Sequence, residues 1–454
     1  MAAGAPRGAG GGDGRGGGLR ASLSGLTTRG RSFLAAGVAA ALCAYVLGQG
    51  ELLRVGLLLA TLPLVCVLAL HRTRHRVSGS RRLTPGRVPA GAEARVRLRL
   101  DNVSRVPTGL LMLQDRVPYV LGPRPRFVLD RVEPGGRREV SYRVRSDLRG
   151  RYPLGPLQLR LGDPFGMVEL TRSFRTYDTL TVVPRTEPLA PLRLGGQASG
   201  HGDGSRRSLA LAGDDDMIPR GYRRGDDLRR VHWRSTARYG ELMVRREEQP
   251  QRSRATVLLD TRRIAFEGAG PDSAFEWAVS GAASAVVHLM EQGFSVRLLT
   301  DTGDTAAPAG PSSGGQESAE GAALMLETLA VVGHSDGAGL SRAYDALGGG
   351  FGTDGGDGLL VAFFGELDDA QSELAARMRR RSGAAVAFVA DRTDPVNRTD
   401  HTDRADRADR AEPLRRLRDA GWTALAVPPG AAFGELWLRA GDAPTATGTP
   451  GGRR

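Results

Sequence analysis

Two apolar runs near the N-terminus are the longest hydrophobic patterns in the chain. They read SFLAAGVAAALCAYVLGQG (Ser32–Gly50) and LLRVGLLLATLPLVCVLAL (Leu52–Leu70). At a rise of about 1.5 Å per residue, each helix can cross a hydrocarbon core of roughly 30 Å. The second run follows the first after one short turn, which favours a hairpin of two transmembrane helices (residues 31–71) over a cleaved signal peptide.

Arginine residues flank this hairpin unequally. Arg20, Arg29 and Arg31 precede it and five more lie between positions 72 and 82, whereas the charged residues at the turn are just Glu51 and Arg54, the latter at the start of the second run. Because positive residues are retained on the cytoplasmic side, both termini and all soluble domains are expected in the cytoplasm. The expected location is therefore the cell membrane, with two spans in the lipid bilayer.

Residues 81–184 alternate between apolar and polar positions in short runs. Examples are ARVRLRL (Ala94–Leu100) and REVSYRVR (Arg138–Arg145), separated by turns that contain Pro and Gly. A period of two is typical of strands with one buried face. This region is predicted to be an all-β, sandwich-like antiparallel module.

After residue 249 the pattern changes to buried strands that alternate with amphipathic helices. The expected strands are 255–260, 294–301, 358–365, 384–391 and 422–429, and the expected helices are 274–293, 320–332, 341–347, 369–381 and 413–420. Such alternation predicts a parallel sheet covered by helices on both faces. The fold class is thus multidomain, with the helical hairpin, the all-β module and a doubly wound α/β domain (residues 249–441).

Segments of biased composition separate and flank these domains. Residues 1–30 and 442–454 are expected to be disordered tails, 185–213 a Gly- and Ser-rich linker, and 392–412 a disordered Asp/Arg insert within the α/β domain. The insert does not match a calcium-binding loop, because it lacks the glycine turn and the terminal glutamate.

The charge of the chain is strongly positive but comes from arginine alone. The sequence has 63 basic and 50 acidic residues, a net charge of +13, and no lysine. Aromatic residues make up only 5% and no basic helix face carries interleaved aromatics, so a nucleic-acid partner is not favoured. The two cysteines, Cys43 and Cys66, lie in the apolar runs, which argues against a disulfide framework or a zinc site.

Residues 214–248 (DDDMIPRGYRRGDDLRRVHWRSTARYGELMVRREE) have the highest density of unusual residues in the chain. A turn at Gly225 and a cap from Asp226 or Asp227 predict a helix that runs to Arg238 and ends at Tyr239–Gly240. One interpretation is a ladder of ion pairs that fixes the segment to the α/β domain.

The other interpretation of this segment is an exposed recognition surface. In it Tyr222 and Trp233 are apolar anchors, and Arg220 and Arg238 bind anionic groups of a partner. Both interpretations are left open by the sequence. The candidate binding residues are Arg220, Tyr222, Gly225, Asp226, Arg229, Trp233, Ala237 and Arg238.

These residues also carry a family resemblance. The pattern Arg220-x-Tyr222-x-x-Gly225-Asp226-x-x-Arg229-x-Val231-x-Trp233-x-x-x-Ala237-Arg238, with Leu242 and Val244 beyond it, resembles the signature of the domain of unknown function 58 family. The resemblance implies a C-terminal half similar to a von Willebrand factor type A domain. It also implies a MoxR-type AAA ATPase and a transglutaminase-like membrane protein as partners, in a cell-envelope process. The expected role is a membrane-tethered adaptor or assembly protein, with no cofactor.

The metal site of a von Willebrand type A domain is expected to be degenerate here. That site uses Asp-x-Ser-x-Ser after the first strand to hold Mg²⁺ with oxygen ligands. In this chain the motif reads Asp260-Thr261-Arg262-Arg263-Ile264, so Arg262 and Ile264 stand at the serine positions. An arginine beside the site removes a ligand and repels a cation, and no metal is expected at Asp260.

Two other classes of function remain as alternatives. A hydrolase could use His232 with Asp226 and Ser235, although His232 and Ser235 are three residues apart on one short helix and no oxyanion-forming Gly motif lies nearby. The net charge would also suit an anionic surface or nucleic acid. We expect a protein without enzymatic activity.

Overall fold

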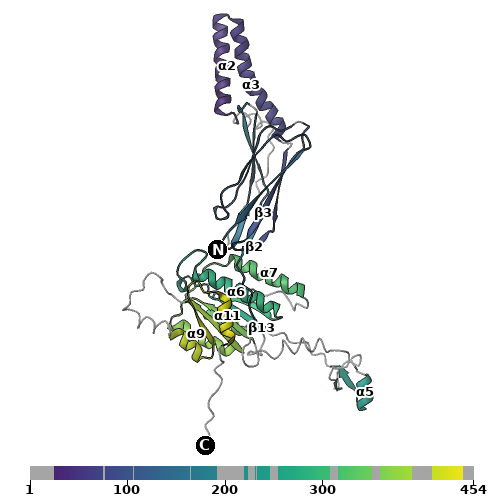
Figure 1. Ribbon diagram of the computed structural model, residues 1–454, viewed down its shortest axis with the longest axis vertical. Helices are drawn as coiled ribbons and strands as arrows, with labels where there is room; N and C mark the ends of the chain where they lie inside the picture. Colours follow the sequence, from purple (N-terminus) through teal and green to yellow (C-terminus); the bar gives the residue numbers. More distant parts are fainter. Residues whose placement is uncertain are drawn as a thin grey trace, which may run out of the picture. The chain divides into compact units, whose positions relative to one another are not determined.

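The computed structural model describes residues 25–74, 77–105, 107–163, 165–191, 219–222, 231, 233–245, 254–306, 315–349, 358–390 and 412–442. The chain divides into two compact units, Met1–Val182 and Val183–Arg454. Figure 1 shows the helices and strands of both units.

The first unit begins with two antiparallel apolar helices, α2 (Thr28–Leu47) and α3 (Gly50–Arg74), which lie side by side (Figure 1). Both are long and apolar enough to cross a membrane, which confirms the two predicted apolar helices. Gly48 ends α2 in the left-handed conformation, with φ 65°.

Two glycines set the close approach of α2 and α3. A Cβ atom on Gly37 would lie 2.6 Å from the backbone nitrogen of Ala60, and one on Gly56 would lie 2.7 Å from that of Ala41. Real Cβ atoms do not approach other atoms so closely, so any side chain at either position would push the helices apart. Small residues at a helix interface allow this backbone contact.

The rest of the first unit is built from short antiparallel strands. Its three sheets are β1 (Val77–Thr84), β3 (Glu93–Asn102) and β6 (Arg137–Arg145); β2 (Arg87–Pro89), β10 (Asp178–Val183) and β7 (Gly150–Leu154); and β5 (Arg126–Leu129), β4 (Leu111–Asp115), β8 (Leu157–Gly162) and β9 (Glu169–Phe174). Along β3 the burial alternates, with Val96, Leu98 and Leu100 inside and the arginines between them facing outward. The period-two pattern thus forms one face of a single core shared by all three sheets.

The second unit contains a six-stranded sheet in the order β15-β14-β13-β16-β17-β18. The strands are β13 (Arg254–Leu259), β14 (Ser295–Thr300), β15 (Thr305–Ala306), β16 (Leu359–Phe364), β17 (Ala384–Ala390) and β18 (Thr423–Val427). All neighbours pair parallel except the short edge strand β15, which is antiparallel to β14.

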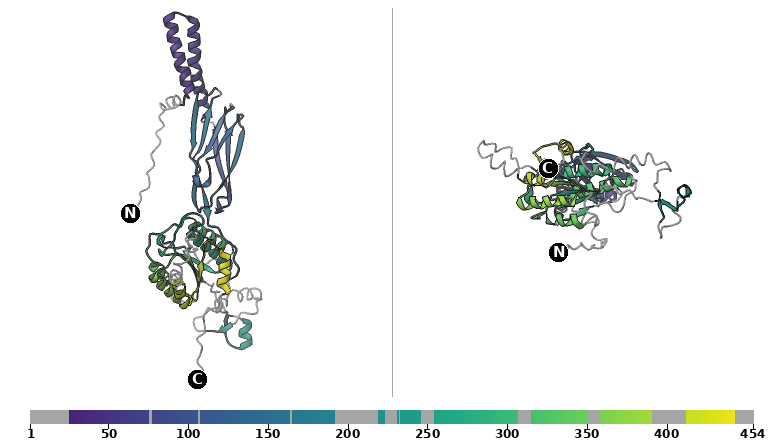
Figure 2. Two further views of the ribbon diagram at one scale, coloured as in Figure 1. Left: turned by 60° about the vertical axis from the view of Figure 1, so that its left-hand side comes forward. Right: turned by 90° about the horizontal axis from the view of Figure 1, so that it is seen from below.

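Helices cover both faces of this sheet (Figures 1 and 2). One core joins Val257 and Leu259 of β13 to α6 (Ala274–Glu291), α7 (Gly315–Val331) and α11 (Phe433–Asp442). The other core joins Leu258 to α8 (Ser341–Gly349), α9 (Asp369–Met378) and the helix formed by residues 412–419. Because neighbouring residues of a strand face opposite ways, both layers must be apolar, and the predicted α/β arrangement is confirmed.

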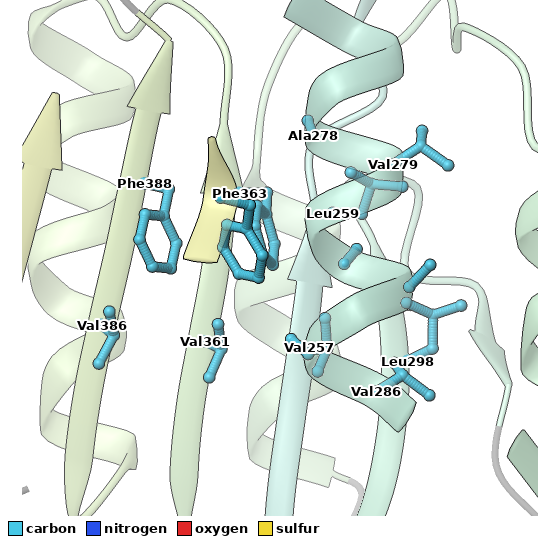
Figure 3. Close-up of a cluster of buried hydrophobic side chains, with 14 of the residues drawn as sticks. Val257, Leu259, Ala278, Val279, Val286, Leu298, Val361, Phe363, Val386 and Phe388 are labelled. Carbon is cyan, nitrogen blue, oxygen red and sulfur yellow. The ribbon is translucent and has the colours of Figure 1, made fainter. Parts of the chain in front are cut away.

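The core beneath α6 is packed with aromatic and branched side chains. Figure 3 shows Phe363 and Phe388 on adjacent strands, and their stacked rings lie 5.3 Å apart between centroids. Gly281 of α6 faces this pair, and a Cβ atom there would lie 2.5 Å from Cε1 of Phe363. Strand β15 and helix α11 were not predicted from the sequence pattern.

Candidate functional site

The segment of unusual residues forms a small ribbon with one helix. Strand β11 (Pro219–Gly221) pairs antiparallel with β12 (Met243–Arg245), and α5 (Trp233–Tyr239) lies between them in the sequence. The backbone nitrogen of Tyr222 donates to the carbonyl oxygen of Leu242 at 2.7 Å. The backbone nitrogen of Met243 donates to the hydroxyl of Thr236 at 3.0 Å, which fixes the helix to the ribbon.

The helix is shorter than the sequence suggested. A helix from Asp227 was expected, but Val231 is in a β-bridge and α5 begins only at Trp233, so that prediction was wrong at its start. A β-branched residue such as valine is well suited to extended pairing, which here prevails over helix propensity. The expected end is confirmed, because α5 stops at Tyr239 and Gly240 has φ 74°.

Several candidate binding side chains are on the surface. Trp233 is 71% exposed, and Tyr239, Leu242 and Tyr222 are exposed as well. Arg238 is exposed and makes no hydrogen bond or ion pair with another described residue. We call Tyr222, Trp233, Arg238, Tyr239 and Leu242 the docking surface.

The remaining candidates are described in part or not at all. Arg220 lies in β11 opposite Val244, and Ala237 is exposed on α5. Gly225, Asp226, Arg229 and His232 lie outside the described residues, and of Ser235 only the backbone, within α5, is described.

A second candidate site lies at the carboxyl end of the parallel sheet. Asp260 follows β13 and Gly365 follows β16, and the chain order reverses between these two strands. In doubly wound sheets, ligands bind outside the carboxyl ends of the strands at such a point. This is also where the degenerate metal motif lies.

A cation of the protein itself fills that position. Arg262, only 2% exposed, donates from Nε and Nη2 to the two carboxylate oxygens of Asp260 at 2.9 and 2.8 Å. Its Nη2 also donates to the carbonyl oxygen of Glu366 at 3.1 Å. Oδ2 of Asp260 accepts a further hydrogen bond from the backbone nitrogen of Gly365 at 3.2 Å.

Burial raises the pKa of the Asp260 carboxyl, and the neighbouring Arg262 guanidinium partly offsets that effect. The carboxylate that would hold a metal is thus already neutralised by a bidentate arginine. Within the described ranges, no group of three or more His, Cys, Asp or Glu side chains is placed to hold a metal ion. The donor set at Asp260 does not fit Mg²⁺.

Comparison with known proteins finds a family for part of the second unit. Residues 219–396 match the family model described as "Protein of unknown function DUF58". This part of the chain belongs to the DUF58 family. The match includes both the docking surface and the Asp260–Arg262 pair.

A curated relative supports the DUF58 assignment. The uncharacterized protein YeaD of Bacillus subtilis (strain 168) is 27% identical over 274 residues, which cover 58% of this chain and 65% of that protein. The chain therefore matches slightly less than two thirds of that relative's length.

Two solved structures share short stretches. The CARDB domain of the PF1109 protein from Pyrococcus furiosus, solved in complex with di-metal ions, is 11% identical, with a TM-score of 0.19 over 24% of this chain and 94% of that chain. The Pseudomonas fluorescens alkylpurine DNA glycosylase AlkC, solved bound to DNA containing an abasic site analog, is 14% identical, with a TM-score of 0.15 over 28% of this chain and 39% of that chain. Likeness at these scores carries no argument about function.

A second buried carboxylate in the DUF58 region was not found from the sequence. Asp301 follows β14 and accepts hydrogen bonds from the backbone nitrogen of Thr261 at 2.8 Å and from the hydroxyl of Ser335 at 2.6 Å. The hydroxyl of Thr261 also donates to Asp301. An acidic residue directly after a buried strand was the available signal. These hydrogen bonds join the loops that follow β13 and β14 to the segment at Ser335.

The β module contains a buried ionic network that the sequence analysis also missed. Arg81 and Asp115 form an ion pair with both side chains fully buried, and Nε of Arg81 donates to Oδ2 of Asp115 at 2.9 Å. The hydroxyl of Tyr142 donates to the same oxygen at 2.6 Å, and Nη1 of Arg81 donates to the carbonyl oxygen of Leu154 at 2.9 Å. These residues come from β1, β4, β6 and β7, so the network links all three sheets of the module.

Proposed function

We propose that this protein is a membrane-tethered adaptor or assembly protein that works by protein–protein interaction. The observation that carries this proposal is the docking surface. Trp, Tyr and Arg are enriched among the few residues that contribute most of the binding energy of protein interfaces. Arg238, five residues after Trp233 on α5, is also exposed and supports a partner with anionic groups.

Different observations support the membrane location and the partner. The two apolar helices support a hairpin in the cell membrane, and the arginine flanks support cytoplasmic termini and soluble domains. The strand order, with one antiparallel edge strand, supports a fold similar to a von Willebrand factor type A domain. The resemblance noted in the sequence supports a MoxR-type AAA ATPase as the partner, with a transglutaminase-like membrane protein as a further one.

The site chemistry favours docking over catalysis. Two carboxylates, Asp260 and Asp301, lie at the carboxyl ends of the strands. They accept hydrogen bonds from Arg262, Thr261 and Ser335. Neither is presented to solvent, so neither is available to a substrate as it stands. A hydrolase based on His232 and Asp226 is the alternative, and it requires an activity that disappears in His232→Ala.

The first prediction concerns capture of the partner. We expect detergent-solubilised protein to bind a purified MoxR-type AAA ATPase, and Trp233→Ala or Arg238→Ala to weaken binding about 30-fold, the effect of losing roughly 2 kcal/mol at an interface hot spot. Binding is measured by surface plasmon resonance with the full-length chain immobilised.

Ile264→Ala is the matched control, because this residue is an apolar side chain of the same unit that is 68% exposed. It should bind like the wild type. Binding that both docking-surface variants retain would overturn the docking role, and a wild type that binds no such ATPase would overturn the partner. A steep fall in binding to DNA with rising salt would instead favour the anionic-polymer alternative.

A further inference from the structure

A tight turn between β8 and β9 presents an aromatic side chain to the outside. The carboxylate of Asp163 accepts hydrogen bonds from the backbone nitrogens of Phe165 at 3.0 Å and Val168 at 2.6 Å. Gly166 closes the turn with φ 69°. Phe165 is thereby held in place and yet 59% exposed.

This turn is fixed to the start of the first apolar helix. The hydroxyl of Thr27 donates to the carbonyl oxygen of Gly166 at 2.7 Å, and the backbone nitrogen of Thr27 donates to that of Met167 at 2.9 Å. Thr27 is also the N-cap of α2. A Cβ atom on Gly30 would lie 2.3 Å from the carbonyl oxygen of Met167, so the contact leaves no room for a side chain.

The length of α2 indicates where the turn lies relative to the bilayer. Its 20 residues span about 30 Å, which equals the hydrocarbon thickness of a bilayer, so a membrane-spanning α2 begins at the interface. Arg29 and Arg31, in its first turn, are suited to the headgroup layer. The turn is hydrogen-bonded to Thr27 at the start of α2, so it lies at the same level as the headgroup layer.

Apolar side chains are exposed on both the helix and the turn. Phe33 and Val38 of α2 are exposed, as lipid-facing residues of a span are, and Phe165 lies next to the N-terminal end of the same helix. Cys66, Val67 and Leu70 of α3 are instead buried in the core of the β module. The β module thus packs against the C-terminal part of α3.

We propose that the 163–168 turn is a membrane-interface anchor, with Phe165 inserted among the lipid headgroups of the leaflet that faces the module. This inference rests on the proposed insertion of the hairpin. An exposed phenylalanine ring can insert at the boundary between headgroups and acyl chains, as the apolar residues of interfacial segments do. An anchor next to the span holds the β module at a fixed tilt against the membrane.

The test places a fluorophore at the turn in the full-length protein. Phe165→Cys, in a Cys43→Ala/Cys66→Ala background, is labelled with an environment-sensitive dye and reconstituted into vesicles of phosphatidylcholine and phosphatidylglycerol. We expect emission shifted to shorter wavelength, quenching by lipids with a nitroxide near the headgroup, and poor quenching by iodide in the buffer.

The matched control is Tyr119→Cys in the same background. Tyr119 is 92% exposed and comes shortly after Asp115, the last residue of β4. Asp115 pairs with Leu157 at the start of β8, whereas the turn follows the end of β8. Tyr119 is therefore near the opposite end of β8 from the turn. A label there should have the emission of an aqueous dye and be quenched by iodide. A label at position 165 that behaves like the one at position 119 would overturn the anchor.

A label on the native Cys43, which is exposed on α2, separates this result from failure of the hairpin. With Cys43 in lipid and position 165 in water, only the anchor is overturned. With Cys43 in water, the hairpin does not span the bilayer, and the membrane tether and the anchor both fail.

Discussion

Buried arginines organise both units at the level of single residues. Arg81 pairs with Asp115 inside the β module, and Arg262 pairs with Asp260 at the carboxyl end of strand β13 in the α/β sheet. A guanidinium can stay charged inside a protein because its five N–H groups have a fixed geometry. They can donate hydrogen bonds to a carboxylate and to neighbouring carbonyl oxygens at the same time. Each of these buried carboxylates therefore has an arginine as its ion-pair partner.

Removing one member of such a pair should be far more costly than removing both. Arg81→Met is expected to destabilise the β module by about 3–5 kcal/mol, because it leaves the Asp115 carboxylate buried without a cation. The double variant Arg81→Met/Asp115→Leu should recover most of that loss, since two apolar side chains need no counter-charge. Hydrogen exchange of the β3, β4 and β8 amides measures both effects.

Arg143→Met is the control for loss of an arginine from the same module. Arg143 forms an exposed ion pair with Glu93, which should contribute less than about 1 kcal/mol. Amides of Arg81→Met as protected as those of the wild type, or a double variant no more stable than the single one, would show that the buried pair does not hold the sheets together.

At the scale of elements, α6 depends on close contact with β16. Gly281 lowers helix propensity, yet it lets the helix backbone approach the ring of Phe363. Aromatic rings of that cluster are stacked and have little room to move. Packing between elements therefore outweighs the preference of the helix for alanine.

Gly281→Ala should accordingly destabilise the α/β unit by about 1–3 kcal/mol through overpacking. Gly434→Ala, in the first turn of α11, is the matched change, since its Cβ would lie 3.6 Å from the nearest atom, an ordinary contact. That variant should be neutral or slightly stabilising. Urea unfolding followed by tryptophan fluorescence distinguishes them, and equal midpoints for the two variants would contradict the overpacking argument.

Element boundaries show what local pattern can predict. The buried strands of the α/β unit and helices α6, α8 and α9 were expected within a few residues of their observed limits, because their periods of two and 3.6 reflect which faces are buried. The start of α5 was misplaced, because Val231 is in a β-bridge and not in the helix. The short edge strand β15 carries too few residues for any period to be recognised.

At the scale of the whole molecule, the two units have separate cores. The core of the first unit contains residues between Leu26 and Val182, whereas the two cores of the second contain residues from Ala255 onward. Among the residues that the structure describes, no buried residue belongs to the cores of both units. Each unit can therefore lose its packing without loss of packing in the other.

A substitution in one unit should then leave unfolding of the other unchanged. All four tryptophans (Trp233, Trp277, Trp422 and Trp437) lie after Val183. The tryptophan fluorescence transition of Arg81→Met in urea should match that of the wild type, while hydrogen exchange in the β module increases. A fluorescence midpoint that moves together with the exchange would show that the units unfold as one.

The sequence by itself determined the kind of each element: two apolar helices, a module of alternating strands, a doubly wound sheet, and an arginine where a metal motif would need a serine. Those features are local, because hydrophobic periodicity and residue type depend only on near neighbours in the chain. Only the tertiary structure decided which distant residues meet. Arg81 bonds Asp115 across 34 residues, Arg262 bonds Glu366 across 104, and Thr27 bonds Gly166 across 139. Such contacts depend on how strands cross over and sheets close, which one sequence without its fold does not specify.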